Sequence, residues 1–117
     1  MGPTADDLDE YDDATVYPDG TVVRISVRRT EDEAYPSGWR YTFHYGALTA
    51  GPETLDDGTI RRYDNAHERT KGHERHVAPD PEPERIEFPG IEELYEQFWD
   101  EIPKPRFGPD DTGDTHD

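Results

Sequence analysis

The stretch WRYTFHY, residues 39–45, is the clearest structural signal in this chain of 117 residues. Aromatic residues occupy every second position, and polar residues lie between them. The aromatic set is Trp39, Tyr41, Phe43 and Tyr45, and the polar set is Arg40, Thr42 and His44. Side chains alternate between the two faces of a β-strand, so this pattern predicts a strand with one buried face and one solvated face.

Three other segments carry strand signals. Residues 21–29 alternate in the same way, with Val23, Ile25 and Val27 on one face and Arg24, Ser26 and Arg28 on the other. Residues 59–64 follow an Asp-Gly turn, and residues 73–77 form a shorter candidate. Prolines at positions 79, 81 and 83 then predict an extended connection.

One helix is expected after Pro89-Gly90. Apolar residues recur there at helical spacing, at Ile91, Leu94, Tyr95, Phe98 and Ile102. Pro103 is expected to end the helix. The predicted fold class is therefore α+β, with an antiparallel sheet of about four strands and one C-terminal helix packed on one face.

The two ends of the chain are expected to lie outside this fold. Residues 1–14 contain six acidic and no basic residues, which predicts a disordered arm. Residues 103–117 contain prolines at positions 103, 105 and 109 and finish in a polar, acidic stretch, which predicts a second disordered tail. A single α+β domain is expected over residues 15–102.

The charge composition is typical of a protein from a salt-in, halophilic cytoplasm. The net charge is −17, the acidic residues are dispersed, and only two lysines accompany ten arginines. Self-repulsion at this charge destabilises a small domain at ordinary ionic strength, and molar salt screens it. The alternative is an acidic interaction protein from an ordinary cell.

Composition also limits location and chemistry. The chain has no cysteine, which excludes disulfides and thiolate metal sites. No stretch approaches the roughly 18 apolar residues of a membrane helix, and no signal sequence opens the chain. We therefore expect a cytoplasmic protein that does not contact membranes.

A locally cationic segment interrupts this acidic chain. Residues 59–77 hold five basic and three acidic residues, a net charge of +2, while the other 98 residues carry −19. Three of the five histidines, His67, His73 and His76, also lie here. Arginine pairs well with phosphate, and histidine transfers protons near neutral pH. The segment predicts an anion site, extended by Arg24, Arg28, Arg40 and His44 if their strand faces adjoin. The alternative is a salt-bridged strand without a ligand.

A metal site is a second possibility for the same residues. Imidazoles of His67, His73 and His76 with the carboxylate of Asp64 have the donor types that zinc or manganese prefers. However, His73 and His76 are expected on opposite faces of a regular strand. We therefore expect no metal and no cofactor.

The run Arg61-Arg62-Tyr63-Asp64-Asn65-Ala66-His67, followed by His73 and His76, resembles the TumE-type toxin family of toxin–antitoxin pairs. The resemblance extends over about residues 20–102. It implies a small cytoplasmic toxin with a cognate antitoxin, commonly a helix-turn-helix protein. The positions that match the family are Arg62, Tyr63, Asp64, Asn65, His67, His73 and His76.

These observations predict a toxin that acts on RNA, with metal-independent phosphodiester cleavage. The candidate catalytic residues are His67, His73, His76 and Asp64, with His73 or His76 as general base or acid and Asp64 orienting a histidine. The candidate substrate-binding residues are Arg61, Arg62, Tyr63, Asn65, Arg75, His44 and Arg40. The alternatives are a non-catalytic module that docks nucleic acid or a partner protein through a basic strand face, and a family member without activity.

Overall fold

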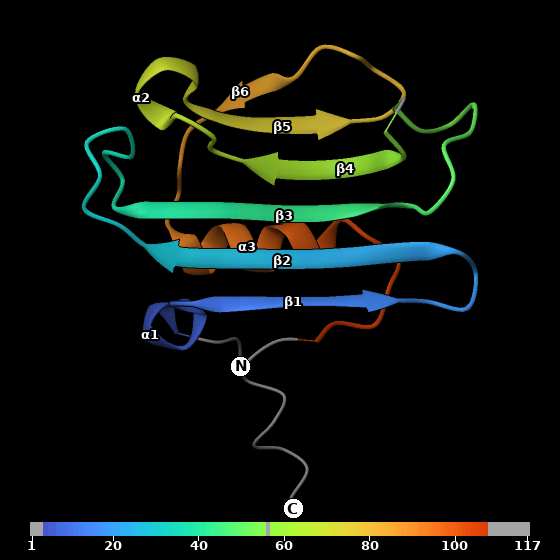
Figure 1. Cartoon of the computed structure of the whole chain (residues 1–117), viewed down its shortest axis with the longest axis horizontal. Coiled ribbons are helices and arrows are strands. Elements are labelled where there is room, and N and C mark those ends of the chain that lie inside the picture. Colours follow the sequence, from blue (N-terminus) through green and yellow to red (C-terminus); the bar gives the residue numbers. More distant parts are fainter. Residues whose placement is uncertain (1–3, 56, 108–117) are drawn as a thin grey trace, which may run out of the picture.

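Six antiparallel strands lie side by side in the order in which the chain forms them (Figure 1). The computed structural model describes residues 4–55 and 57–107. The strands are β1 (Tyr11–Val16), β2 (Thr21–Arg29), β3 (Trp39–Ala47), β4 (Thr59–Asp64), β5 (His73–Val77) and β6 (Glu84–Ile86). The predicted α+β class is confirmed, with β1 and β6 in addition to the four expected strands.

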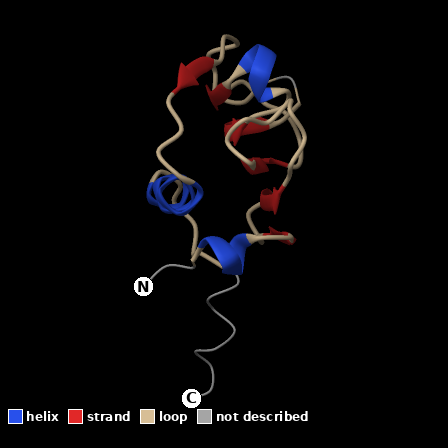
Figure 2. Ribbon diagram, turned by 90° about the vertical axis from the view of Figure 1, so that its left-hand side faces the viewer, coloured by secondary structure: helices blue, strands red, loops and turns tan. Residues whose placement is uncertain are grey.

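Among the residues that the structure describes, three helices accompany the sheet: α1 (Ala5–Leu8), α2 (Glu68–Lys71) and α3 (Ile91–Asp100). The long helix α3 lies against one face of the sheet, as Figure 2 shows edge-on. Its first turn carries Glu92 and Glu93, which suit the positive end of the helix dipole. We call the sheet face that packs on α3 the helix face, and the opposite one the outer face.

The core fills the space between α3 and the aromatic stripe of the sheet. Phe98 from α3 packs on Phe43 and Tyr63, with ring centroids 5.6 and 6.2 Å apart. These three side chains are fully buried. The aromatic face predicted from residues 39–45 is therefore the helix face, which leaves the polar positions of the same strands on the outer face.

The N-terminal boundary differs from the expected one at residue 14. Residues 5–16 form α1 and β1, and Leu8 is fully buried. Thr4 and Asp7 cap α1 reciprocally, and the Asp6 carboxylate pairs with Arg29 at 2.7 Å. One buried leucine and the backbone hydrogen bonds to β2 hold this short edge segment in place. The acidic composition of residues 1–14 gives no sign of these contacts.

The C-terminal segment also continues past α3. The Tyr95 hydroxyl donates to the Phe107 carbonyl at 2.8 Å, and the Phe107 ring contacts Trp99 edge-on. The rest of the predicted tail, residues 108–117, lies outside the described residues. Within the described ranges, no helix is both long and apolar enough to cross a bilayer.

Candidate functional site on the outer face

Strand register divides the cationic segment between the two faces of the sheet. Arg62 lies opposite His76, and Asp64 lies opposite Glu74, across the β4–β5 ladder. These four residues share the outer face. Their sequence neighbours Arg61, Tyr63 and Arg75 alternate to the helix face. The segment therefore builds two separate groups of side chains rather than one surface.

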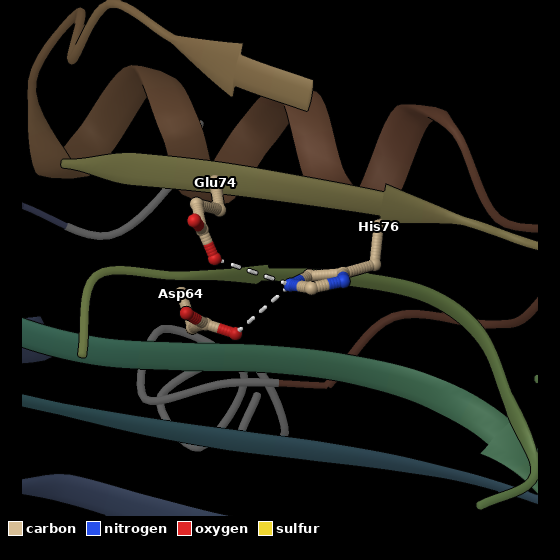
Figure 3. A group of neighbouring side chains, drawn as sticks. All are labelled: Asp64, Glu74 and His76. Atoms are coloured by element: carbon tan, nitrogen blue, oxygen red, sulfur yellow. Dashed lines mark ion pairs between the residues drawn. The ribbon is translucent and has the colours of Figure 1, made fainter. Parts of the chain in front are cut away.

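The outer cluster, defined as Arg62, Asp64, Glu74 and His76, brings opposite charges into contact. Arg62 Nε lies 2.9 Å from Asp64 Oδ2, and Arg62 Nη2 lies 3.3 Å from His76 Nε2. Figure 3 shows His76 between the two carboxylates, with Nε2 at 3.6 Å from Asp64 Oδ2 and from Glu74 Oε1. The four side chains are between 13 and 28% exposed, so solvent reaches them.

The contacts of His76 fix how its ring can act. A guanidinium only donates hydrogen bonds, so His76 Nε2 accepts from Arg62 when the ring is neutral, and Nδ1 then carries the proton. Once Nε2 takes up a proton, the charged ring forms ion pairs with the carboxylates of Asp64 and Glu74, which both lie 3.6 Å from Nε2. The arrangement supplies a partly exposed imidazole lone pair beside a fixed positive charge.

His44 borders the outer cluster on the neighbouring strand. It lies opposite Arg62 across the β3–β4 ladder, and its Nε2 is 3.1 Å from the Thr59 hydroxyl. Burial lowers the pKa of His44, and the positive charge of Arg62 lowers it further. His44 is therefore neutral at neutral pH and suits hydrogen bonding better than proton donation.

Exposed arginines continue the outer face toward β2. Arg24, Arg28 and Arg40 are exposed, and none of them has an ion pair within the described part of the chain. Arg28 and Arg40 line a hollow of about 690 Å³ together with Thr42, the strand partner of Asp64. Glu10 and Asp12 line the same hollow. The hollow therefore places two guanidinium groups without a carboxylate partner in residues 4–55 and 57–107 beside the outer cluster, and that of Arg40 lies over the Tyr35 ring at 5.9 Å.

The helix-face group is neutralised by carboxylates. Arg61 Nη1 and the Tyr63 hydroxyl both reach Glu101 Oε1, at 2.7 and 2.6 Å. Arg75 pairs with Glu84 and lies 3.7 Å from Glu101 Oε2. Burial and the bond to Glu101 raise the pKa of Tyr63. For Arg61, Tyr63 and Arg75, the geometry agrees with the salt-bridged alternative.

His73 and Asn65 lie in the interior. His73 Nδ1 is 2.8 Å from the Tyr41 hydroxyl, and Nε2 is 2.8 Å from Glu68 Oε1. Asn65 is fully buried, accepts from the Tyr41 amide at 3.0 Å and donates to the Trp39 carbonyl at 2.7 Å. These contacts satisfy both side chains and join the end of β4 to β3.

His67 lies apart from the other two motif histidines. It is exposed, has a left-handed backbone (φ 56°) before α2, and its ring stacks on Tyr35 at 6.4 Å. The metal set considered from sequence therefore does not assemble, because its three histidines occupy a loop, the interior and the outer face. A different trio, Asp64, Glu74 and His76, has ligating atoms that all lie within 4.8 Å of one another. Strand alternation between positions 74 and 76 is the signal that identifies Glu74.

Comparison with known proteins adds one finding. A family model described as Toxin TumE matches residues 5–106, which include the whole sheet, α3 and both groups of charged side chains. No curated protein and no solved structure matches the chain.

Proposed function

Because this chain belongs to the TumE toxin family, it is the toxin component of a toxin–antitoxin pair, and we propose that it cleaves RNA in the cytoplasm without a metal ion. Its partner is a cognate antitoxin. We further propose a helix-turn-helix protein for that role, on the family resemblance of residues 61–76. Co-purification of this chain with the co-expressed antitoxin, and loss of RNA cleavage when the two purified proteins are mixed, would support this assignment.

The observation that carries the proposal is the contact of His76 Nε2 with Arg62 on a solvent-reached sheet face. In the proposed step, Nε2 removes the proton of a ribose 2′-hydroxyl, and the 2′-oxygen attacks the adjacent phosphorus. The bond from phosphorus to the 5′-oxygen breaks, and that oxygen takes a proton from solvent. The products are a 2′,3′-cyclic phosphate and a 5′-hydroxyl.

The cations of the outer face have distinct roles in this proposal. Arg62 shifts from His76 to the non-bridging phosphate oxygens and stabilises the charge that develops there. Asp64 then contacts the protonated imidazole. His44 hydrogen-bonds substrate beside Arg62, and Arg24, Arg28 and Arg40 hold flanking phosphates along the strands.

The helix-face and interior candidates are left out of this proposal. Arg61, Tyr63 and Arg75 already bind carboxylates, and His73 and Asn65 are enclosed by their partners. His67 is exposed but lies on a loop beside Tyr35. Their contribution is to hold the sheet that positions the outer cluster.

Cleavage of RNA by the full chain in molar potassium chloride with EDTA tests the proposal. The wild type is expected to leave 2′,3′-cyclic phosphate ends, and His76→Ala is expected to lose at least about a hundredfold in rate. The matched control is His67→Ala, which removes an exposed imidazole elsewhere. Equal loss in both variants, or full activity of His76→Ala, contradicts the assignment.

Binding without cleavage is the other outcome that the geometry favours. Arg28 and Arg40 line the hollow without an ion pair among the described residues, and they suit a module that docks nucleic acid or a partner protein without reacting. Tight RNA binding by wild type, with no cleavage in the presence or absence of added metal, replaces the catalytic proposal with this one.

A further inference from the structure

We propose that Asp64, Glu74 and His76 form a binding site for a divalent transition-metal ion of the zinc class, and that Arg62 competes with the ion for this site. The site combines one imidazole nitrogen with two carboxylates, and the inference does not depend on whether RNA is the substrate. Binding of the ion occupies the Nε2 lone pair of His76.

The positions of the three ligating groups support the site. His76 Nε2 lies 3.6 Å from both carboxylates, and all ligating atoms lie within 4.8 Å. Two ligands of a tetrahedral zinc ion are about 3.4 Å apart, given metal–ligand distances of about 2.1 Å. Small side-chain rotations of Asp64 and Glu74 therefore bring the donors to bonding distance. The ligands come from two hydrogen-bonded strands, which hold their backbones in register.

Arg62 occupies the place of a cation among these ligands, and it fits them poorly. Its Nε is buried and makes no aligned hydrogen bond, although Asp64 Oδ2 is 2.9 Å away. A planar guanidinium prefers a two-pronged bond to one carboxylate, whereas here it touches Asp64 and His76 from one edge. A compact ion can contact all three ligands at once, which Arg62 does not.

Arg62 also has a second carboxylate to turn to. Its Nη1 lies 3.6 Å from Asp57 Oδ2, on the exposed turn before β4. When an ion takes Asp64, the guanidinium can keep an ion pair by moving toward Asp57. A divalent ion brings two positive charges to the carboxylates of Asp64 and Glu74, where the guanidinium brings one, so Coulomb attraction favours the ion.

The donor set selects the class of ion. An imidazole with two carboxylates suits Zn²⁺ or Mn²⁺, while Mg²⁺ prefers oxygen ligands and retains its waters. Three protein ligands leave a fourth position for water, as in open zinc sites. We therefore expect Zn²⁺ to bind more tightly than Mg²⁺.

Calorimetric titration of Zn²⁺ into the untagged full chain tests the site. One equivalent is expected to bind, and His76→Ala and Glu74→Gln are each expected to weaken binding at least about tenfold. The decisive variant is Arg62→Gln, which is expected to tighten binding at least about tenfold, because it removes the competing cation and keeps all three ligands. The His76 Nε2 nitrogen signal in NMR should shift with one equivalent of Zn²⁺.

The variant Arg69→Gln is the control for the change in net charge. Arg69 is exposed and pairs with Glu33 at 3.5 Å, so its loss removes one positive charge away from the outer cluster. This variant is expected to bind Zn²⁺ as the wild type does. Unchanged binding in His76→Ala, or equal tightening in Arg62→Gln and Arg69→Gln, overturns the proposal and indicates diffuse binding to surface carboxylates.

Discussion

The Tyr41 hydroxyl lies 2.8 Å from Nδ1 of His73, and both side chains are buried on the helix face of the sheet. The other ring nitrogen of His73 contacts Glu68, and its ring stacks on Phe88 at 4.6 Å. His76, three residues further, lies on the outer face. The two histidines of one short strand therefore have separable consequences when they are changed.

His73→Ala is expected to lower the free energy of unfolding by about 2–3 kcal/mol, because it removes the buried ring, the partner of the Tyr41 hydroxyl and one of the partners of Glu68. His76→Ala is expected to lower it by less than about 1 kcal/mol, because that side chain is partly solvated. Urea unfolding of both variants in the same potassium chloride buffer measures the difference. Equal destabilisation contradicts the assignment of His73 to the interior.

Alkaline pH is expected to unfold the protein through its buried tyrosines. Burial raises the pKa of Tyr41 and of Tyr63 above the ordinary value of 10.0. The unfolded chain thus releases these protons at lower pH than the folded chain, so their stabilising contribution is complete below pH 10 and is lost as pH rises above it. Tyrosinate absorbance and circular dichroism followed together measure this effect. If Tyr41 and Tyr63 ionise while the fold persists, the burial argument fails.

Gly58→Ala is expected to lower the free energy of unfolding by about 2 kcal/mol or more. Gly58 has a φ of 89°, and a Cβ there would lie 2.5 Å from the Ala47 carbonyl oxygen. The Ala47 N–H donates to the Gly58 carbonyl at 2.8 Å, so this close approach belongs to the β3–β4 connection. Gly51→Ala is the control, since no atom lies within 4 Å of the added methyl. Thermal unfolding of the two variants should separate them, and matching melting temperatures count against the close approach.

Much of the fold was predictable because strand alternation reports which face is buried. The expected strands at 21–29, 59–64 and 73–77 coincide with β2, β4 and β5, and the stretch at 39–45 forms most of β3. Period-two alternation needs only the sequence. The edge strands were missed because β1 is mostly exposed and lies within an acidic stretch, and β6 has only three residues.

The candidate site was only partly predictable, because the net charge of a segment does not show which side chains lie on which face of the sheet. The cationic segment coincides with β4, α2 and β5, but its net charge does not show that Arg61 and Arg62 point to opposite faces. Glu101, which neutralises Arg61, comes from the end of α3 and carries no local signal in the cationic segment. Long-range partners of this kind depend on how the helix docks.

Potassium chloride at molar concentration is expected to raise the melting temperature by about 5 °C or more, relative to low salt. The reason is that salt screens repulsion within a chain of net charge −17. Scanning calorimetry across a potassium chloride series measures the shift. A melting temperature that is flat or falls with salt contradicts the halophilic interpretation of the composition.

The exposed arginines of the outer face are expected to set the salt dependence of RNA binding. Arg28 and Arg40 line the same hollow and have no ion pair among the described residues. If each binds one phosphate of a single strand, Arg28→Gln/Arg40→Gln should reduce the slope of log affinity against log salt by about 1.4. Fluorescence anisotropy with labelled RNA across a salt series measures the slope, with Arg69→Gln as the charge-matched control. If the double variant has the same slope as the wild type, the phosphates do not bind at Arg28 and Arg40.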